Sequence, residues 1–217
     1  MRELRRQIGS RGIASITIRD LASASGVATK TLYNLFGSKD ALIAETIRYT
    51  YRDVMGAIDK NKPGLDAFGH LTAYVSASAR FNLEERIYSR AAIYAYYSAD
   101  TALISFHRDF HDYIGGAINR LLTEMKESGE LRPWSPPSVI SRQIVECMLS
   151  TAAEWARGML SDEQLVDASM LGVLSLVHGH LTDLRKPETR ARIEALSAKL
   201  SAEPGGIRQT NRTRSSN

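Results

Sequence analysis

Residues 17–36, TIRDLASASGVATKTLYNLF, decide the fold. Thr17 is a favourable N-cap, and Asp20 follows three residues later, close to the capping-box pattern that begins many helices. Gly26 tolerates the positive φ that a tight turn between two helices requires. Apolar residues repeat at i, i+3 and i+4 in both halves, as Ile18, Leu21 and Ala22, then Leu32, Leu35 and Phe36. The stretch predicts a helix, a tight turn with Val27 as its apolar plug, and a second helix.

The polar side of the second helix is chemically suited to DNA. A helix in the major groove reads base edges with side chains near its N-terminus, which here are Thr29, Lys30 and Thr31. Hydroxyl, amide and cationic donors nearby suit base edges and phosphate oxygens. The candidate DNA-binding residues are Thr17, Arg19, Ala28, Thr29, Lys30, Thr31, Tyr33, Asn34 and Lys39. The same spacing also fits an ordinary helical hairpin with a solvated polar face.

Residues 26–42, GVATKTLYNLFGSKDAL, resemble the DNA-binding signature of the tetracycline-repressor (TetR) family. The preceding segment, 17–22, resembles the pattern T-x-[RE]-x-[IL]-A that comes before the signature in that family. The resemblance implies an all-α regulator that binds DNA as a dimer. By that resemblance, backbone contacts fall to Thr17 and Arg19, base or phosphate contacts to Thr29 and Lys30, and phosphate contacts to Tyr33 and Lys39.

Two positions depart from the family pattern. Ala28 stands where a serine usually begins the recognition helix, so that helix loses a cap and a phosphate hydrogen bond. Leu35 stands where a histidine or tyrosine usually precedes the phenylalanine, which alters packing within the N-terminal DNA-binding domain, called the head below. The first helix is also short, because only residues 1–11 precede Gly12.

Composition favours a basic N-terminal head, residues 1–39, on a mildly acidic body, residues 63–202. The chain has 217 residues, 43% of them hydrophobic, and a net charge of +4. Residues 1–39 hold seven Lys or Arg and two acidic residues, whereas residues 63–202 hold 14 and 17. Such a head suits contact with phosphates, and a random scatter of surface charge is the alternative. Cys147 is the only cysteine, which excludes an intrachain disulfide and a multi-cysteine zinc site.

The sequence gives no sign of an enzyme, a cofactor or a membrane segment. It lacks a Gly-rich phosphate loop, a nucleophile elbow and an HExxH motif, so we expect no catalytic residue and no cofactor. No apolar run is long enough to span a bilayer. We therefore expect a cytoplasmic protein. A catalytic helical protein stays the weakest alternative.

The rest of the chain is predicted to be helical. One long amphipathic helix, capped by Ser38, runs to about Lys60 and ends at Pro63 and Gly64. Further helices are expected at residues 65–78, 83–98, 101–128, 137–160, 162–184 and 188–200. The prediction is an all-α protein of about nine helices, divided into a DNA-binding domain at 1–45, an effector-binding and dimerisation domain at 46–202, and a disordered tail at 203–217.

Helices 137–160 and 162–184 carry the pattern of a dimer interface. Small residues repeat along the second of them, and glycine inside a helix indicates that a neighbouring helix comes close. We expect the two helices to pair with their copies in a four-helix interface. The candidate interface residues are Ile144, Met148, Thr151, Trp155, Ala168, Gly172, Ser175 and Gly179. The alternative is that the small-residue stripe and the apolar stripe of these helices both pack within one chain.

A concentration of tyrosines favours a pocket for a partly apolar or aromatic small-molecule effector. The candidate lining residues are Tyr74, Tyr88, Tyr94, Tyr97, Phe106, His107, Phe110 and His111. Plain core packing is the alternative for each tyrosine. His107 and His111 stand at i, i+4, but two histidines without a third ligand predict no metal site.

The main hypothesis is therefore a dimeric transcriptional repressor released from its DNA operator by a small effector. The alternative is an effector-independent DNA-binding protein that shapes DNA or recruits a partner.

Overall fold

The computed structural model describes residues 2–11, 16–60, 64–97 and 104–202. Ten helices succeed one another in these ranges: α1 (Arg2–Arg11), α2 (Ile18–Ala24), α3 (Thr29–Phe36), α4 (Lys39–Lys60), α5 (Ala67–Glu84), α6 (Arg86–Tyr96), α7 (Ile104–Glu127), α8 (Pro137–Ala156), α9 (Asp162–His178) and α10 (Lys186–Ala202). No strand forms in the described ranges, where β-pairing is limited to a single bridge between Leu131 and Leu181. The all-α prediction is confirmed, while the expected tail at 203–217 lies outside the described residues.

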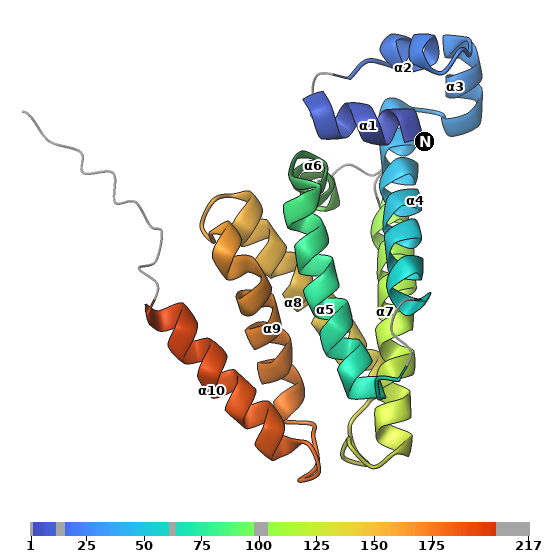
Figure 1. Cartoon of the computed structure of the whole chain (residues 1–217). Helices are drawn as coiled ribbons and strands as arrows, with labels where there is room; N and C mark the ends of the chain where they lie inside the picture. The colour runs from blue at the N-terminus through green and yellow to red at the C-terminus, as the bar shows by residue number, and fades with distance from the viewer. Residues whose placement is uncertain (1, 12–15, 61–63, 98–103, 203–217) are drawn as a thin grey trace, which may run out of the picture.

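The head, α1–α3 with the start of α4, stands at one end of the molecule (Figure 1). The Thr17 hydroxyl accepts a hydrogen bond from the Asp20 N–H at 3.1 Å, and the Thr17 N–H donates to the Asp20 carboxylate at 3.3 Å. This complete capping box fixes the start of α2. Gly26 has a φ of 66°, which only glycine adopts without strain, and so the turn forms as predicted.

Helix α4 joins the head to the body. The Ser38 hydroxyl accepts from the Ala41 N–H at 3.0 Å, and the helix then runs to Lys60 as predicted. Two threonines on its buried side, Thr46 and Thr50, donate to carbonyl oxygens one turn earlier at 3.0 and 2.9 Å. Their hydroxyls are therefore satisfied inside the protein, and α4 packs on α7 without an unpaired polar group at these two positions.

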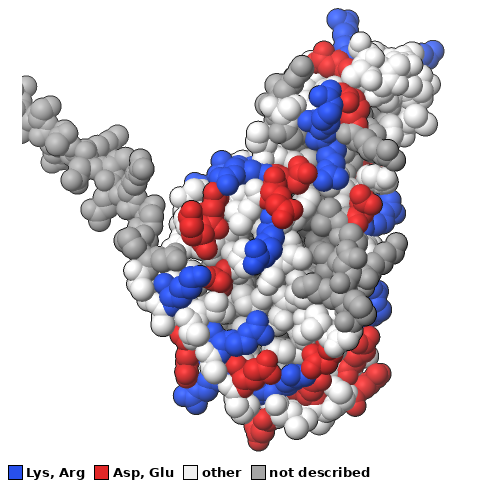
Figure 2. Space-filling view, viewed as in Figure 1, with Lys and Arg blue, Asp and Glu red and all other residues white. Residues whose placement is uncertain are grey.

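The body is a layered bundle in which α5, α7, α8 and α9 enclose the core and α10 packs on the outside of α9 (Figure 1). Val75, Ile118, Ile144 and Leu174 show how completely these helices bury their apolar stripes, since none is more than 1% exposed. Figure 2 shows Asp and Glu side chains gathered at the end of the body away from the head. None of the described helices has the length and apolarity needed to cross a membrane.

Several predicted helix boundaries were wrong. The helix predicted at 65–78 continues to Glu84, and the next begins at Arg86, because the single residue Glu85 (φ −108°, ψ 46°) turns the corner without glycine or proline. The predicted helix at 137–160 ends at Ala156, and Gly158 then has a φ of 76°. The helix predicted at 162–184 ends at His178, since Leu181 leaves it to pair with Leu131.

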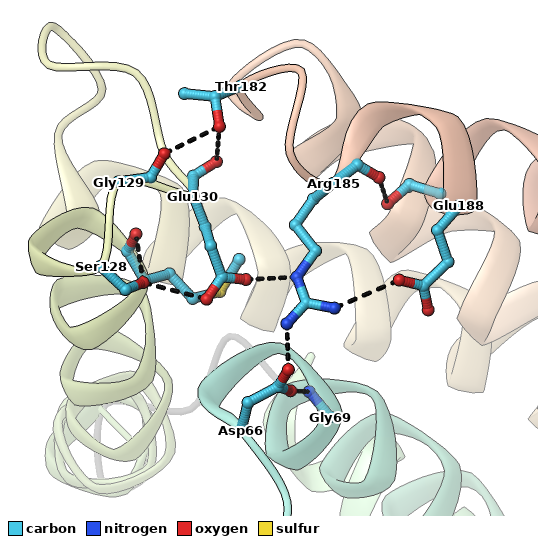
Figure 3. A network of polar contacts seen from close by, with 10 residues as sticks. Asp66, Gly69, Ser128, Gly129, Glu130, Thr182, Arg185 and Glu188 are labelled. Carbon is cyan, nitrogen blue, oxygen red and sulfur yellow. Dashed lines mark hydrogen bonds and ion pairs between the residues drawn. The ribbon is translucent and has the colours of Figure 1, made fainter.

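Arg185 joins three elements at the end of the body that is distant from the head (Figure 3). Its Nε donates to Glu130 at 2.5 Å, Nη1 donates to Glu188 at 3.2 Å, and Nη2 donates to Asp66. Asp66 also caps α5 by accepting from the Gly69 N–H at 2.7 Å, and this bond, helped by Arg185, lowers the pKa of the Asp66 carboxyl. One guanidinium thus joins α5, the loop after α7 and the start of α10.

Candidate nucleic-acid interface and ligand groove

The outer side of α3 is polar and exposed. Its exposed polar residues are Lys30, Thr31, Tyr33 and Asn34. Thr29 is half-buried at the start of the helix, while Leu32 and Phe36 pack, partly buried, against the core. Ammonium, hydroxyl, phenol and amide groups therefore face outward on one helix at the far edge of the head (Figure 1). These are the groups that bond to base edges and phosphates.

Further cations lie on the elements beside α3. Arg19 is exposed on α2, and Lys39 is half-buried at the first position of α4. Neither of them, nor Lys30, forms an ion pair with another residue that the structure describes. Thr17 is exposed, although its side chain already caps α2. The head consequently offers uncompensated positive charge next to the polar face of α3.

Two apolar residues of the head are more exposed than predicted, and the start of α3 lacks a side-chain cap as predicted. Leu35, expected to pack inward, is 67% exposed, because the buried side of α3 is centred on Leu32 and Phe36. Val27 is 39% exposed and does not plug the turn as predicted. The loss of the cap at Ala28 is confirmed, since no side chain accepts the free N–H groups of α3. Leu35 and Val27 are apolar surface residues of the head that sequence periodicity assigned to its interior.

The head is attached to the body through α1 as well as α4. Arg5 Nη2 lies 3.1 Å from Glu85 Oε1 at the corner between α5 and α6. The Arg5 guanidinium also lies 6.0 Å from the centre of the Tyr88 ring, and the Tyr88 hydroxyl donates to the Thr46 carbonyl at 3.4 Å. Helices α1, α4 and α6 therefore meet at one junction between the head and the body.

A groove of about 700 Å³ lies between α7 and α8, with the end of α6 beside it. The Tyr96 hydroxyl lies 2.6 Å from His111 Nε2, and the same nitrogen lies 3.0 Å from Glu146 Oε1. Burial, reinforced by the Glu146 charge, raises the pKa of Tyr96, so the phenol stays protonated. The volume is that of a small-molecule site, and the described lining is largely polar.

The predicted pocket residues are dispersed. Tyr74 and Tyr88 are buried in the core, whereas Tyr94 and Tyr97 are 59% and 44% exposed, because Tyr94 lies on the solvent side of α6 and Tyr97 follows the last residue of that helix. His111 lines the groove. The side chains of Phe106, His107 and Phe110 lie outside the described part of the chain. No group of three or more metal-ligating side chains occurs among the described residues.

The predicted interface residues fall into two groups. Ile144 and Trp155 are buried within the single chain, and the Trp155 indole donates to Asp162 at 2.7 Å, so neither side chain is available to a partner. A Cβ added to Gly172 would lie 2.7 Å from Cys147 Sγ, which shows that the close neighbour of α9 is α8 of the same chain. The remaining candidates are half-buried or exposed: Met148, Thr151, Ala168, Ser175 and Gly179, the last being the C-cap of α9.

Comparisons with known proteins agree with this architecture. The family model described as "Bacterial regulatory proteins, tetR family" matches residues 2–46, which span α1 to the first part of α4. The HTH-type transcriptional repressor KstR2 of Rhodococcus jostii (strain RHA1) is 33% identical over 85 residues, or 39% of this chain. That match spans 41% of the length of KstR2.

Solved structures with the same fold cover most of the chain. Thermus thermophilus FadR, a TetR-family repressor in complex with lauroyl-CoA, has a TM-score of 0.67 at 18% identity over 82% of this chain and 95% of FadR. A TetR-family regulator from Rhodococcus sp. has a TM-score of 0.65 at 17% identity over 84% of this chain and 100% of the other. Residues 2–46 are thus similar to the TetR family of bacterial regulatory proteins, and the whole chain shares the fold of solved TetR-family regulators.

Proposed function

We propose that the chain is a transcriptional repressor that binds operator DNA through α3. The observation that supports this most strongly is the division of α3 into a partly buried side, Leu32 and Phe36, and an exposed polar side on a helix-turn-helix at one end of the molecule. Such a protein acts where DNA is, so we place it in the cytoplasm. Activation instead of repression would use the same interface.

The proposed DNA contacts divide by role. Arg19, Tyr33 and Lys39 bind phosphates, and Thr17 contacts the backbone beside them. Thr29, Lys30, Thr31 and Asn34 lie nearest to base edges, with Ala28 at the start of the helix bringing its backbone close to the DNA. Loss of a phosphate contact weakens binding to every sequence alike, whereas loss of a base contact also changes sequence preference.

The proposed repressor is a dimer formed through α8 and α9. Half-buried and exposed small residues on the outer side of these helices, among them Thr151, Ala168 and Ser175, support a close helix-to-helix contact. A twofold dimer places two copies of α3 in successive major grooves, roughly 34–36 Å apart. Sedimentation equilibrium at micromolar concentration tests this step, and a monomer contradicts it.

The proposed trigger is a small molecule bound in the body. FadR, a structural neighbour, is described with lauroyl-CoA, which supports a ligand-binding body in this fold. A partly apolar or aromatic effector was expected from the sequence, but the described lining of the groove between α7 and α8 favours a ligand rich in hydrogen-bonding groups. The ligand favours a spacing of the two heads that no longer fits the operator.

Selection of bound genomic fragments by the purified protein tests the DNA-binding function. We expect a short shared sequence among the fragments, and we expect Arg19→Ala to lower the slope of log affinity against log salt by about 1. Lys30→Ala and Thr29→Ala should also change which fragments are retained. An effector-independent DNA-binding protein, the second candidate, would retain fragments and stay bound in the presence of every ligand that occupies its body.

A further inference from the structure

The groove between α7 and α8 is long enough for an extended polar ligand. His111 of α7 lies opposite Glu146 of α8, and Asn119 and Ser138 line the groove further along the same pair of helices. The eight residues from His111 to Asn119 span about 12 Å of helix. A molecule with six or more carbon atoms in a chain fits this length.

The polar side chains that line the groove differ in whether they have partners. Tyr96, His111 and Glu146, whose side chain is 53% exposed, bond to one another. At the rim, Asp112 of α7 and Arg142 of α8 are exposed and form no hydrogen bond or ion pair through their side chains with a described residue. One wall therefore carries a free carboxylate, which accepts hydrogen bonds, and the other carries a free guanidinium, which donates them.

A glycine keeps the middle of the groove open. Gly116 lies inside α7, where glycine is unfavourable for helix stability. A Cβ added there would meet no atom within 4 Å, so no packing against a neighbouring helix explains the absence of a side chain. The position leaves space that a ligand can fill.

We propose that this groove binds a polyhydroxylated carboxylate, the chemical class of the sugar acids. The ligand carboxylate pairs with Arg142, and its hydroxyl groups donate to Asp112 and accept from the Asn119 amide. A purely apolar ligand would remove the two free charges from water without replacing their hydrogen bonds, which is unfavourable. Its role as an effector rests on the proposed function, whereas its binding to the groove does not.

D-gluconate is the probe, and isothermal titration of the full chain is the measurement. D-glucitol keeps the hydroxyl groups without the carboxylate, and hexanoate keeps the carboxylate without the hydroxyl groups. We expect gluconate to bind at least tenfold more tightly than either. Arg142→Gln should weaken gluconate binding at least tenfold, and Gly116→Leu should abolish it by filling the groove. Arg190→Gln, a change at an exposed arginine of α10, is the matched control and should leave binding unchanged.

The outcomes separate this inference from the proposed function. Equal binding of gluconate, glucitol and hexanoate, or gluconate binding that survives Gly116→Leu in a variant with wild-type circular dichroism, overturns the inference. Binding of gluconate that fails to release DNA supports the site and removes its role as an effector. Failure of the protein to retain any DNA fragment overturns the proposed function and leaves the binding result standing.

Discussion

Arg5 and Glu85 join the head to the body, with Nη2 of Arg5 3.1 Å from Oε1 of Glu85. Both side chains are about a third exposed, at 32% and 39%, so the ion pair lies in partly screened surroundings. Its importance lies in its position, because Glu85 is the corner residue between α5 and α6. The pair fixes α1 against the start of α6, the helix whose other end borders the groove.

We therefore predict that Glu85→Gln changes DNA affinity more than stability. The free energy of unfolding should fall by only about 0.2–1 kcal/mol, as is usual for exposed pairs. The head should be less firmly oriented, and operator affinity should fall several-fold in an anisotropy titration. Glu84→Gln is the matched control, since Glu84 is exposed on the same helix end. Equal operator affinity of the two variants would contradict this role for the pair.

The contact between Gly172 and Cys147 predicts a stability defect that a second change repairs. A methyl group at Gly172 would lie 2.7 Å from the Cys147 sulfur, so Gly172→Ala forces α8 and α9 apart. We expect a loss of about 1–3 kcal/mol in the free energy of unfolding. Cys147→Ala removes the sulfur, so the double variant should recover most of that loss in a denaturant titration. Strictly additive effects of the two changes would show that the helices do not touch there.

Arg185 is predicted to stabilise the end of the body away from the head (Figure 3). Arg185→Met leaves the Glu130 carboxylate, in a residue only 9% exposed, without its cation. A carboxylate left unpaired in such a place is destabilising, and we expect a loss of roughly 2 kcal/mol or more in urea unfolding. Arg190→Met, at an exposed position of α10, should change stability by less than about 0.5 kcal/mol. Equal midpoints for the two variants would contradict the assignment.

Ala28→Ser is predicted to stabilise the head. Ala28 already has the extended conformation of an N-cap residue, but it has no side-chain oxygen to accept the free N–H groups of α3. A serine hydroxyl there should raise the free energy of unfolding by about 0.5–2 kcal/mol, measured by thermal unfolding. Ala28→Val is the control, because valine also lacks a side-chain oxygen and is as poor an N-cap as alanine. A serine variant no more stable than the valine variant would mean that α3 begins elsewhere.

The sequence predicted the head better than the body because the head depends on local signals. The capping pair Thr17 and Asp20 lies within four residues, and its side chains bond to each other's backbone N–H groups. The turn at Gly26 depends on the φ of that one residue. Leu35 was misassigned because a repeat at i, i+3 and i+4 does not show which edge of a short apolar stripe meets the core. A single residue, Glu85, ended helix α5 although neither glycine nor proline stands there.

The groove between α7 and α8 could not be predicted from the sequence without the tertiary structure. His111 and Glu146 are 35 positions apart, and their contact depends on the register between α7 and α8, which no local pattern records. Gly172 did signal a close helix, but periodicity alone does not distinguish a neighbour in the same chain from one in a second copy. The tyrosines near the end of α6 suggested a pocket, yet Tyr94 and Tyr97 are exposed to solvent. Only Tyr96 of this group lines the groove, together with mostly polar residues of α7 and α8.

Hydroxyl-radical footprinting of a selected genomic fragment tests the central claim most directly. We predict two protected segments on one face of the duplex, centred about one helical turn apart, as expected for two copies of α3 in successive major grooves. Lys30→Ala should weaken both segments equally. A folded, purified sample that protects no segment of any fragment from its own genome in dilute buffer would contradict the account.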